Sequence, residues 1–166
     1  YSDATGPGLD LYYKGALVAH SLRLLIGDEA FFRSLTRLVY DRPDPRPGNF
    51  RPVYRTTPDF IRIVNEEAGR DLGWFFATYV YQAALPRLVL TREGDRATVA
   101  WTDTAAAFPM PLEVEVDGRL RVLDMTTGSA SFPAPAGAHI LLDPHNKLLR
   151  QLDFIDAYKA RERGGG

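Results

Sequence analysis

The spacing of apolar residues changes at Leu85-Pro86, and this change limits the folds that are open to the chain. Before it, apolar residues recur every three or four positions, which is the period of a helix that buries one face. After it, apolar and polar residues alternate, which is the period of a half-buried strand. We therefore expect an α+β chain in two parts, with antiparallel helix pairs in residues 1–84 and a small antiparallel β-sandwich in residues 85–150.

Residues 11–40 are predicted to form two helices joined by a tight corner. The first helix has a broad apolar face, made by Leu17, Val18, Leu22, Leu24 and Leu25. The second has one apolar stripe, made by Phe31, Leu35, Leu38 and Val39. At the corner, Gly27 suits a left-handed residue that ends a helix, and Asp28 suits the cap of the next helix. Because these apolar faces are too broad for one neighbour, we expect the helical part to expose an apolar surface.

A second helix pair is predicted after a connector rich in proline and arginine, residues 41–59. Thr57 suits the cap of the third helix, and Gly69 suits its C-terminal end. Asp71 opens the fourth helix. Four residues of that helix are expected to pack inward: Trp74, Phe75, Tyr79 and Val80. Because the link between the two helices is short, we expect them to lie side by side as a hairpin.

Short strands separated by turn residues predict the β-sandwich. Residues 87–103 are predicted to form one hairpin, and Asp117-Gly118 marks the turn of a second. Two more short strands are expected within residues 129–135 and 138–144. In the strand before Asp117, one face is apolar and consists of Leu112, Val114 and Val116. Residues 151–166 are expected to be a tail, with a short helix followed by disorder.

Composition excludes several classes of function. A hydrophobic content of 45% with 25% charged residues is ordinary for a globular protein and argues against disorder. The net charge of -1 gives no electrostatic basis for binding nucleic acid or an anionic membrane. The chain has no cysteine, which excludes disulfides, thiolate metal ligands and a thiol nucleophile.

Few residues of this chain are candidates for catalysis. The three histidines are His20, His139 and His145, and no pair has the spacing that lets two imidazoles share a zinc ion on one helix. We therefore expect no metal on this chain alone. Glu66 and Glu67 are neighbours on a helix and point in different directions, so we interpret them as a solvated edge rather than an acid/base pair.

Three elements of the sequence occur in an order known from one enzyme family. The first is Tyr12-Tyr13-Lys14-Gly15, and the second is the corner from Ile26 to Phe31. The third is the run from Thr56 to Phe76, with its Asp59-Phe60 pair. Together they resemble the Y-x-K-G element, the LG-x-x-x-F corner and the T-x-x-D-F helix hairpin of zinc aminopeptidases of the aminopeptidase N and leukotriene hydrolase type, the gluzincins.

The resemblance implies one catalytic residue. In that family the tyrosine of Y-x-K-G donates a hydrogen bond to the oxyanion of the tetrahedral intermediate, opposite the zinc, and the matching residue is Tyr12. A phenol can donate where negative charge develops. Tyr13 occupies the variable position, where we expect packing or substrate-lining duty. The H-E-x-x-H and G-x-M-E-N elements of the family are absent and would lie upstream of Tyr1.

The resemblance therefore implies that the chain is the C-terminal portion of a zinc-dependent aminopeptidase that removes N-terminal residues from peptides. Its partners would be a peptide substrate and the N-terminal, zinc-bearing segment of the same protein, and the isolated chain would be inactive. We expect a bacterial-type parent that is cytoplasmic rather than secreted. The rival hypothesis is a non-catalytic interaction module of helices and sandwich, in which Tyr12 is merely buried.

Overall fold

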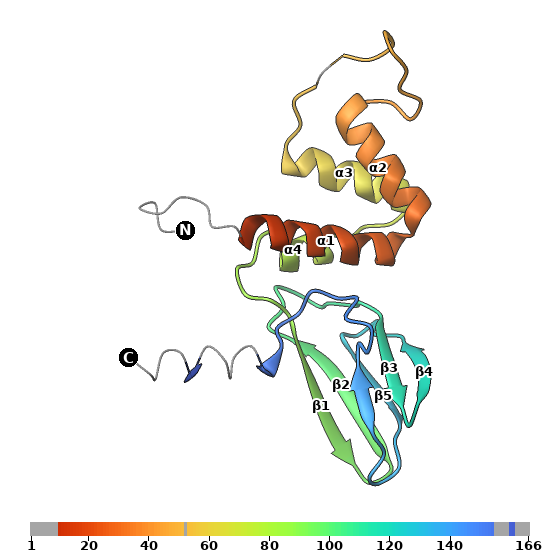
Figure 1. Cartoon of the computed structure of the whole chain (residues 1–166), viewed down its shortest axis with the longest axis vertical. Helices are drawn as coiled ribbons and strands as arrows, with labels where there is room; N and C mark the ends of the chain where they lie inside the picture. The colour runs from red at the N-terminus through yellow and green to blue at the C-terminus, as the bar shows by residue number, and fades with distance from the viewer. Residues whose placement is uncertain (1–9, 52, 155–159, 162–166) are drawn as a thin grey trace. The chain divides into compact units, whose positions relative to one another are not determined.

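The computed structural model describes residues 10–51, 53–154 and 160–161 (Figure 1). The chain forms two compact units, residues 1–76 and 77–166. The first unit holds the helices α1 (Asp10–Ile26), α2 (Asp28–Tyr40) and α3 (Thr57–Ala68). The boundary between the units falls within α4 (Gly73–Tyr79), and the strands belong to the second unit. The predicted α+β chain, with helices first and antiparallel strands after them, is confirmed.

The corner between α1 and α2 forms at Gly27, as predicted, but with a different backbone conformation. Gly27 has a φ of 82° and a ψ of 161°, so its φ is positive while its conformation is not left-handed helical. It caps the N-terminus of α2, and Phe31 donates its N–H to the Gly27 carbonyl at 3.1 Å. Asp28 is the first residue of α2 and not its cap. Its carboxylate instead accepts hydrogen bonds from Arg23 at 2.7 and 2.8 Å, which ties the two helices together at the corner.

The N-terminus of α3 is held by a capping box. Thr56 is the cap, one residue earlier than the sequence pattern predicts. Its side chain accepts from the N–H of Asp59, and the Asp59 carboxylate accepts from the N–H of Thr56 at 2.9 Å. Thr57 loses this role because it is already the first helical residue. At the other end, Gly69 is left-handed with a φ of 64°, which confirms the predicted end of the helix.

Helix α3 packs along α2, and the ring of Phe60 near its start contacts the ring of Phe76 on α4. The residues after α3 bond back to it, because the amide of Asn65 accepts from the Leu72 N–H at 3.0 Å and donates to Asp71 at 3.1 Å. Helix α4 is short and ends at Tyr79, so Val80 lies beyond it and is exposed. The predicted inward packing of Phe75 and Tyr79 is confirmed.

The core of the first unit comes from its helices and from the link into α4. Its buried apolar residues are Leu22, Ala30, Phe31, Ile63, Val64, Leu72, Phe75 and Phe76. The rings of Phe60 and Phe76 pack edge to face with their centroids 5.9 Å apart, as do those of Phe75 and Phe76 at 5.5 Å. On α2, Phe31 is buried but Val39 is exposed, so the predicted stripe is buried at one end only. The described residues of 41–56 form neither helix nor strand, as predicted for a connector.

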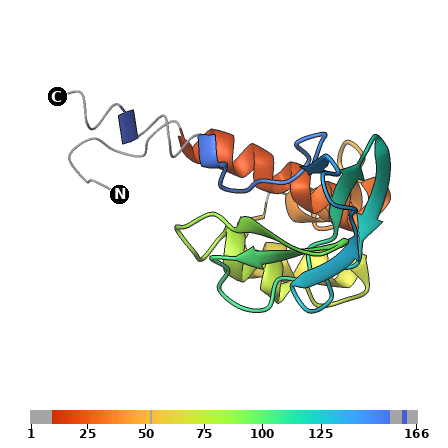
Figure 2. The same cartoon turned by 90° about the horizontal axis from the view of Figure 1, so that it is seen from below.

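The second unit consists of two three-stranded antiparallel sheets within the described residues (Figures 1 and 2). In one sheet, β2 (Arg96–Thr102) lies between β1 (Arg87–Glu93) and β5 (Ser129–Pro133). In the other, β3 (Leu112–Val116) lies between β4 (Arg119–Leu123) and β6 (Ile140–Leu142). The turn between β3 and β4 has positive φ at both Asp117 and Gly118, which confirms the predicted hairpin.

Both central strands bury alternate side chains, as a sandwich requires. On β2 these are Ala97, Val99 and Trp101, and on β3 they are Leu112, Val114 and Val116. The indole N–H of Trp101 donates to the carbonyl of Met110 at 2.9 Å, so this buried ring leaves no unpaired donor. In the tail, Asp153 and Phe154 are helical, whereas residues 155–159 and 162–166 lie outside the described ranges. Ala160 and Arg161 are helical as well, so the predicted short helix is described at these two places.

The capping box predicts that replacing Thr56 by alanine lowers stability more than replacing its neighbour Thr57. Thr56→Ala removes the side-chain acceptor for the N–H of Asp59 and should lower the free energy of unfolding by about 1 kcal/mol. Thr57→Ala is the matched control, since Thr57 is the first residue of the helix. It should change the free energy of unfolding by only about 0.3 kcal/mol. Urea denaturation followed by circular dichroism measures both. Equal losses for the two variants would contradict the assignment of the cap.

Candidate functional site

The first turn of α1 presents the two tyrosines that the sequence singles out. The side chain of Tyr12 is 75% exposed and that of Tyr13 is 71% exposed. Neither hydroxyl pairs with another group of the described ranges. A Cβ added at Gly15 would meet nothing within 4 Å, so the chain leaves space beside the tyrosines as well. Tyr12 is thus free to donate a hydrogen bond to a molecule outside the described part of the chain.

Helix α1 carries an apolar stripe on the side opposite its buried face. Tyr13, Leu17, His20 and Leu24 are all exposed and follow one another at intervals of four, three and four residues. This spacing places them on a single face of the helix. On the other side, Leu22 is fully buried. The helical part therefore exposes an apolar surface, as the breadth of its apolar pattern predicts, and Tyr12 lies next to that surface.

The three histidines lie in unrelated surroundings. His20 is exposed on α1, and the backbone N–H of His139 donates to Asp117 at 2.9 Å. The Nδ1 atom of His145 lies 3.0 Å from a carboxylate oxygen of Glu113. Within the part of the chain that the structure describes, no three His, Asp or Glu side chains lie together in a way that could hold a metal ion. A ligand set for zinc therefore does not exist among the described residues.

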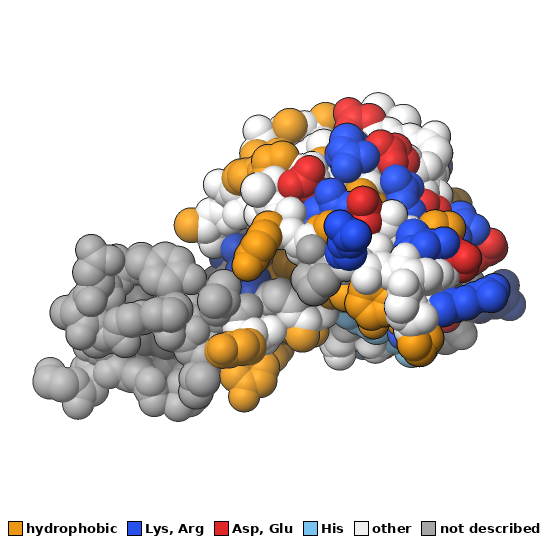
Figure 3. Space-filling view, turned by 90° about the horizontal axis from the view of Figure 1, so that it is seen from above, with side chains coloured by type: hydrophobic (Ala, Val, Ile, Leu, Met, Phe, Trp, Pro, Cys, Tyr) orange, Lys and Arg blue, Asp and Glu red, His pale blue; other side chains and the backbone are white. Residues whose placement is uncertain are grey.

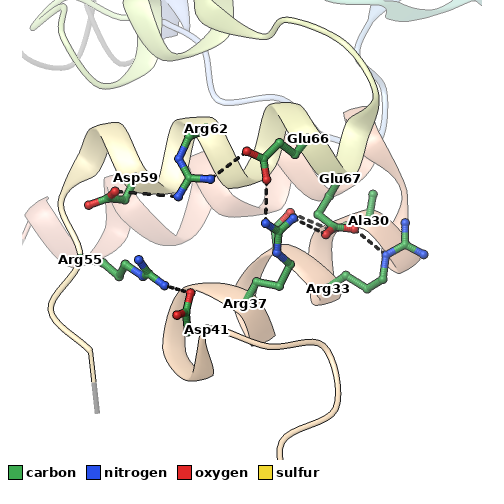
Figure 4. A network of polar contacts seen from close by, with 10 residues as sticks. Ala30, Arg33, Arg37, Asp41, Arg55, Asp59, Arg62, Glu66 and Glu67 are labelled. Atoms are coloured by element: carbon green, nitrogen blue, oxygen red, sulfur yellow. Dashed lines mark hydrogen bonds and ion pairs between the residues drawn. The ribbon is translucent and has the colours of Figure 1, made fainter. Parts of the chain in front are cut away.

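The pair Glu66-Glu67 has a structural role that differs from the predicted one. Arg37 of α2 donates from one guanidinium nitrogen to Glu66 and from the other to Glu67, both at 2.6 Å (Figure 4). Arg33 donates to the second oxygen of Glu67 at 2.7 Å. The Glu67 side chain is only 13% exposed, so its interpretation as part of a solvated edge is wrong. Arg33 and Arg37 are four residues apart in the sequence, which places both on one face of α2. Their partners lie on another helix, so the sequence alone does not identify them.

The two carboxylates are held in their charged form. Hydrogen bonding from Arg37 is the main reason that the pKa of each lies below its ordinary value, and Arg62 adds to this effect for Glu66. A general acid must hold a proton near neutral pH, which these groups do not do. Figure 3 shows the face of the first unit over α2 and α3, where acidic and basic side chains are interspersed. The charges there neutralise one another and serve helix packing rather than chemistry.

Comparisons with known proteins support the fold but identify no family. No family model matches the chain, and no curated protein matches it. One similar solved structure is aminopeptidase A of Legionella pneumophila in complex with aspartic acid, with a TM-score of 0.56 and 16% sequence identity. The match covers 84% of this chain and 17% of that chain. At this identity the likeness concerns the fold alone, so the chain shares the fold of a part of an aminopeptidase.

In the described ranges, no helix combines the length and the apolar character that crossing a lipid bilayer requires.

The ion pairs of Glu67 predict how stability depends on pH. Because its folded-state pKa lies below the ordinary value of 4.5, Glu67 stabilises the fold above pH 4.5. That contribution is lost as the pH falls through the folded-state pKa. The free energy of unfolding at about pH 7 and about pH 3 should therefore differ less for Glu67→Gln than for the unchanged chain. Glu93→Gln on β1, an exposed strand position, is the control and should keep the original difference. An undiminished difference for Glu67→Gln would refute the assignment.

Proposed function

We propose that this chain is the C-terminal portion of a zinc-dependent aminopeptidase of the gluzincin type, which hydrolyses N-terminal residues from peptides. In this proposal Tyr12 is the catalytic residue of the chain. It donates a hydrogen bond to the oxyanion that forms when water adds to the scissile carbonyl. The observation that carries the proposal is the exposed, unengaged hydroxyl of Tyr12 in a Tyr-Tyr-Lys-Gly element, within a fold that is shared with part of an aminopeptidase.

The chemistry asked of Tyr12 is limited and physically simple. A phenol carries its proton at neutral pH and donates a short hydrogen bond to an oxygen whose negative charge grows during the reaction. A rigid helix is a good support for such a donor, because the direction of the hydroxyl must be set before the charge develops. Tyr13 points in another direction from the same turn, and we assign it to lining the substrate or to packing.

The zinc of this proposal comes from the resemblance and not from the chain. The described residues do not fit a zinc site, so the ligands are placed on an upstream segment of the same protein. The apolar stripe of α1 supports such an arrangement, because an exposed apolar helix face is stabilised when another part of a polypeptide covers it. The chain spans 17% of the length of its structural neighbour, which leaves ample room for such a segment in a protein of that size. We also propose a cytoplasmic parent of bacterial type.

The alternative function is a non-catalytic interaction module. Its premise that Tyr12 is buried is wrong, since the side chain is 75% exposed. What still favours it is the set of exposed apolar side chains, which would serve a docking role equally well. The two hypotheses differ in whether removing one hydroxyl, with no change in packing, affects catalysis.

Tyr12→Phe should therefore separate them. In the chain joined to its zinc-bearing segment, loss of one oxyanion donor should lower kcat by roughly 100- to 1,000-fold. Zinc content should stay at one ion per molecule, because the hydroxyl is not proposed as a ligand. Tyr13→Phe is the matched control on the same turn and should leave kcat within a few-fold. A zinc-loaded Tyr12→Phe enzyme with full turnover would exclude the catalytic role.

The apolar stripe gives a second prediction, for the isolated chain. The chain should self-associate at micromolar concentration, and Leu17→Gln with Leu24→Gln should reduce the association without loss of helical content, because both side chains are exposed. Leu22→Gln, on the buried face of the same helix, should instead lower the free energy of unfolding by roughly a few kcal/mol. Light scattering and circular dichroism give these two readouts. A monodisperse unmodified chain would contradict the expectation.

A further inference from the structure

The sheet formed by β4, β3 and β6 has an outward face with an unusual composition. Because side chains alternate along a strand, Glu113 and Glu115 of β3 point away from the buried residues of that strand. The register places Leu120 of β4 and Leu141 of β6 on either side of Glu115. Val122 of β4 lies opposite Glu113. Three apolar side chains and two carboxylates thus share one face of the sheet.

The three apolar side chains of this face are open to solvent. Leu120 is 50% exposed, Val122 is 66% exposed and Leu141 is 40% exposed. The outward face of an antiparallel sheet is usually polar, so neighbouring apolar residues there indicate a contact surface. We call Glu115, Leu120, Val122 and Leu141 the outer patch.

The two carboxylates of the sheet differ in their partners. Glu113 forms an ion pair with Lys147 and a hydrogen bond with His145 at 3.0 Å, and these contacts hold its pKa below the ordinary value. Glu115 has no ion-pair partner within the described ranges. The arginines of β4 do not serve it, because Arg119 and Arg121 pair with Val116 and Val114 and so lie on the other side of the sheet. The outer patch therefore has one uncompensated negative charge among apolar side chains.

From this arrangement we propose that the outer patch is a docking surface for a partner polypeptide that presents a lysine or arginine between apolar side chains. Its apolar residues would cover Leu120, Val122 and Leu141, and its cation would pair with Glu115. Burying a carboxylate costs free energy unless a cation comes with it, which selects for a basic partner. A second copy of this chain docked about a two-fold axis on the patch brings two Glu115 carboxylates together, so like-charge repulsion disfavours it. The inference does not depend on the proposed peptidase function.

A charge-swap experiment tests the proposal. The probe is a nine-residue peptide with valine and lysine alternating at its odd positions and serine between them, so that an extended backbone places valine and lysine on one face. It is titrated into the ¹⁵N-labelled chain, with the matching valine–glutamate peptide for comparison. The valine–lysine peptide should shift the amide signals of β3, β4 and β6 and leave those of β1 in place. Glu115→Lys should weaken its binding about tenfold and should strengthen binding of the valine–glutamate peptide. Glu93→Lys, on β1 of the other sheet, should leave both affinities unchanged.

Two further readouts make the outcome decisive. Val122→Thr keeps a β-branched side chain and should weaken binding several-fold without changing the dispersion of the amide spectrum. The proposal fails if the valine–lysine peptide shifts no signals of the outer patch, or if Glu93→Lys weakens binding as much as Glu115→Lys. It also fails if the signals of the patch shift with protein concentration alone, which would identify a second copy as the occupant.

Discussion

The fork of Arg37 fixes how the helices of the first unit pack. Its guanidinium donates to carboxylates of two successive residues of α3, so α2 cannot slide along α3 without breaking both ion pairs. Helix α1 is held to this pair by two contacts near the corner. Arg23 pairs with Asp28, and Arg70, just after α3, donates to the carbonyl of Leu25 at 3.0 Å. These contacts join α1, which carries Tyr12, to the pair of α2 and α3.

Among the described residues, this packing leaves α1 with one apolar face buried and a second that is exposed. A helix that is apolar on opposite sides belongs between two layers of protein. In the first unit one layer is present, and the exposed stripe marks where a second layer would lie. We propose that a segment covering the stripe also encloses the hydroxyl of Tyr12, which lies on the same turn of α1 as Tyr13, the first residue of the stripe. Enclosure matters because a hydrogen bond to a developing charge is worth more when water is excluded.

The sequence predicted the elements well and their partners less well. The change of period at Leu85-Pro86 and the turn at Asp117-Gly118 follow from local backbone preferences, and both were confirmed. The cap of α3 was misplaced by one residue because Thr56 and Thr57 have the same capping chemistry, and only the helix register separates them. The packing of α3 on α2 could not be predicted from the sequence, because the ion pairs of Arg37 with Glu66 and Glu67 join residues about thirty positions apart.

For the candidate site, too, some features could be predicted from the sequence and others could not. That Tyr12 is exposed on a helix could not be derived from periodicity, because the same apolar pattern fits a buried face. Its catalytic role is a proposal that rests on the resemblance of a short motif. The burial of Glu67 was missed since its two arginine partners lie about thirty residues away in the sequence, at Arg37 and Arg33.

The most direct test of the proposed role of Tyr12 is a crystal structure of the chain joined to the proposed zinc-bearing segment, with a tetrahedral phosphinate analogue of a peptide bound. We expect the Tyr12 hydroxyl to lie within about 2.5–3.2 Å of the phosphinate oxygen that represents the oxyanion. A Tyr12 side chain that contacts only protein, with that oxygen held by other donors, would contradict it.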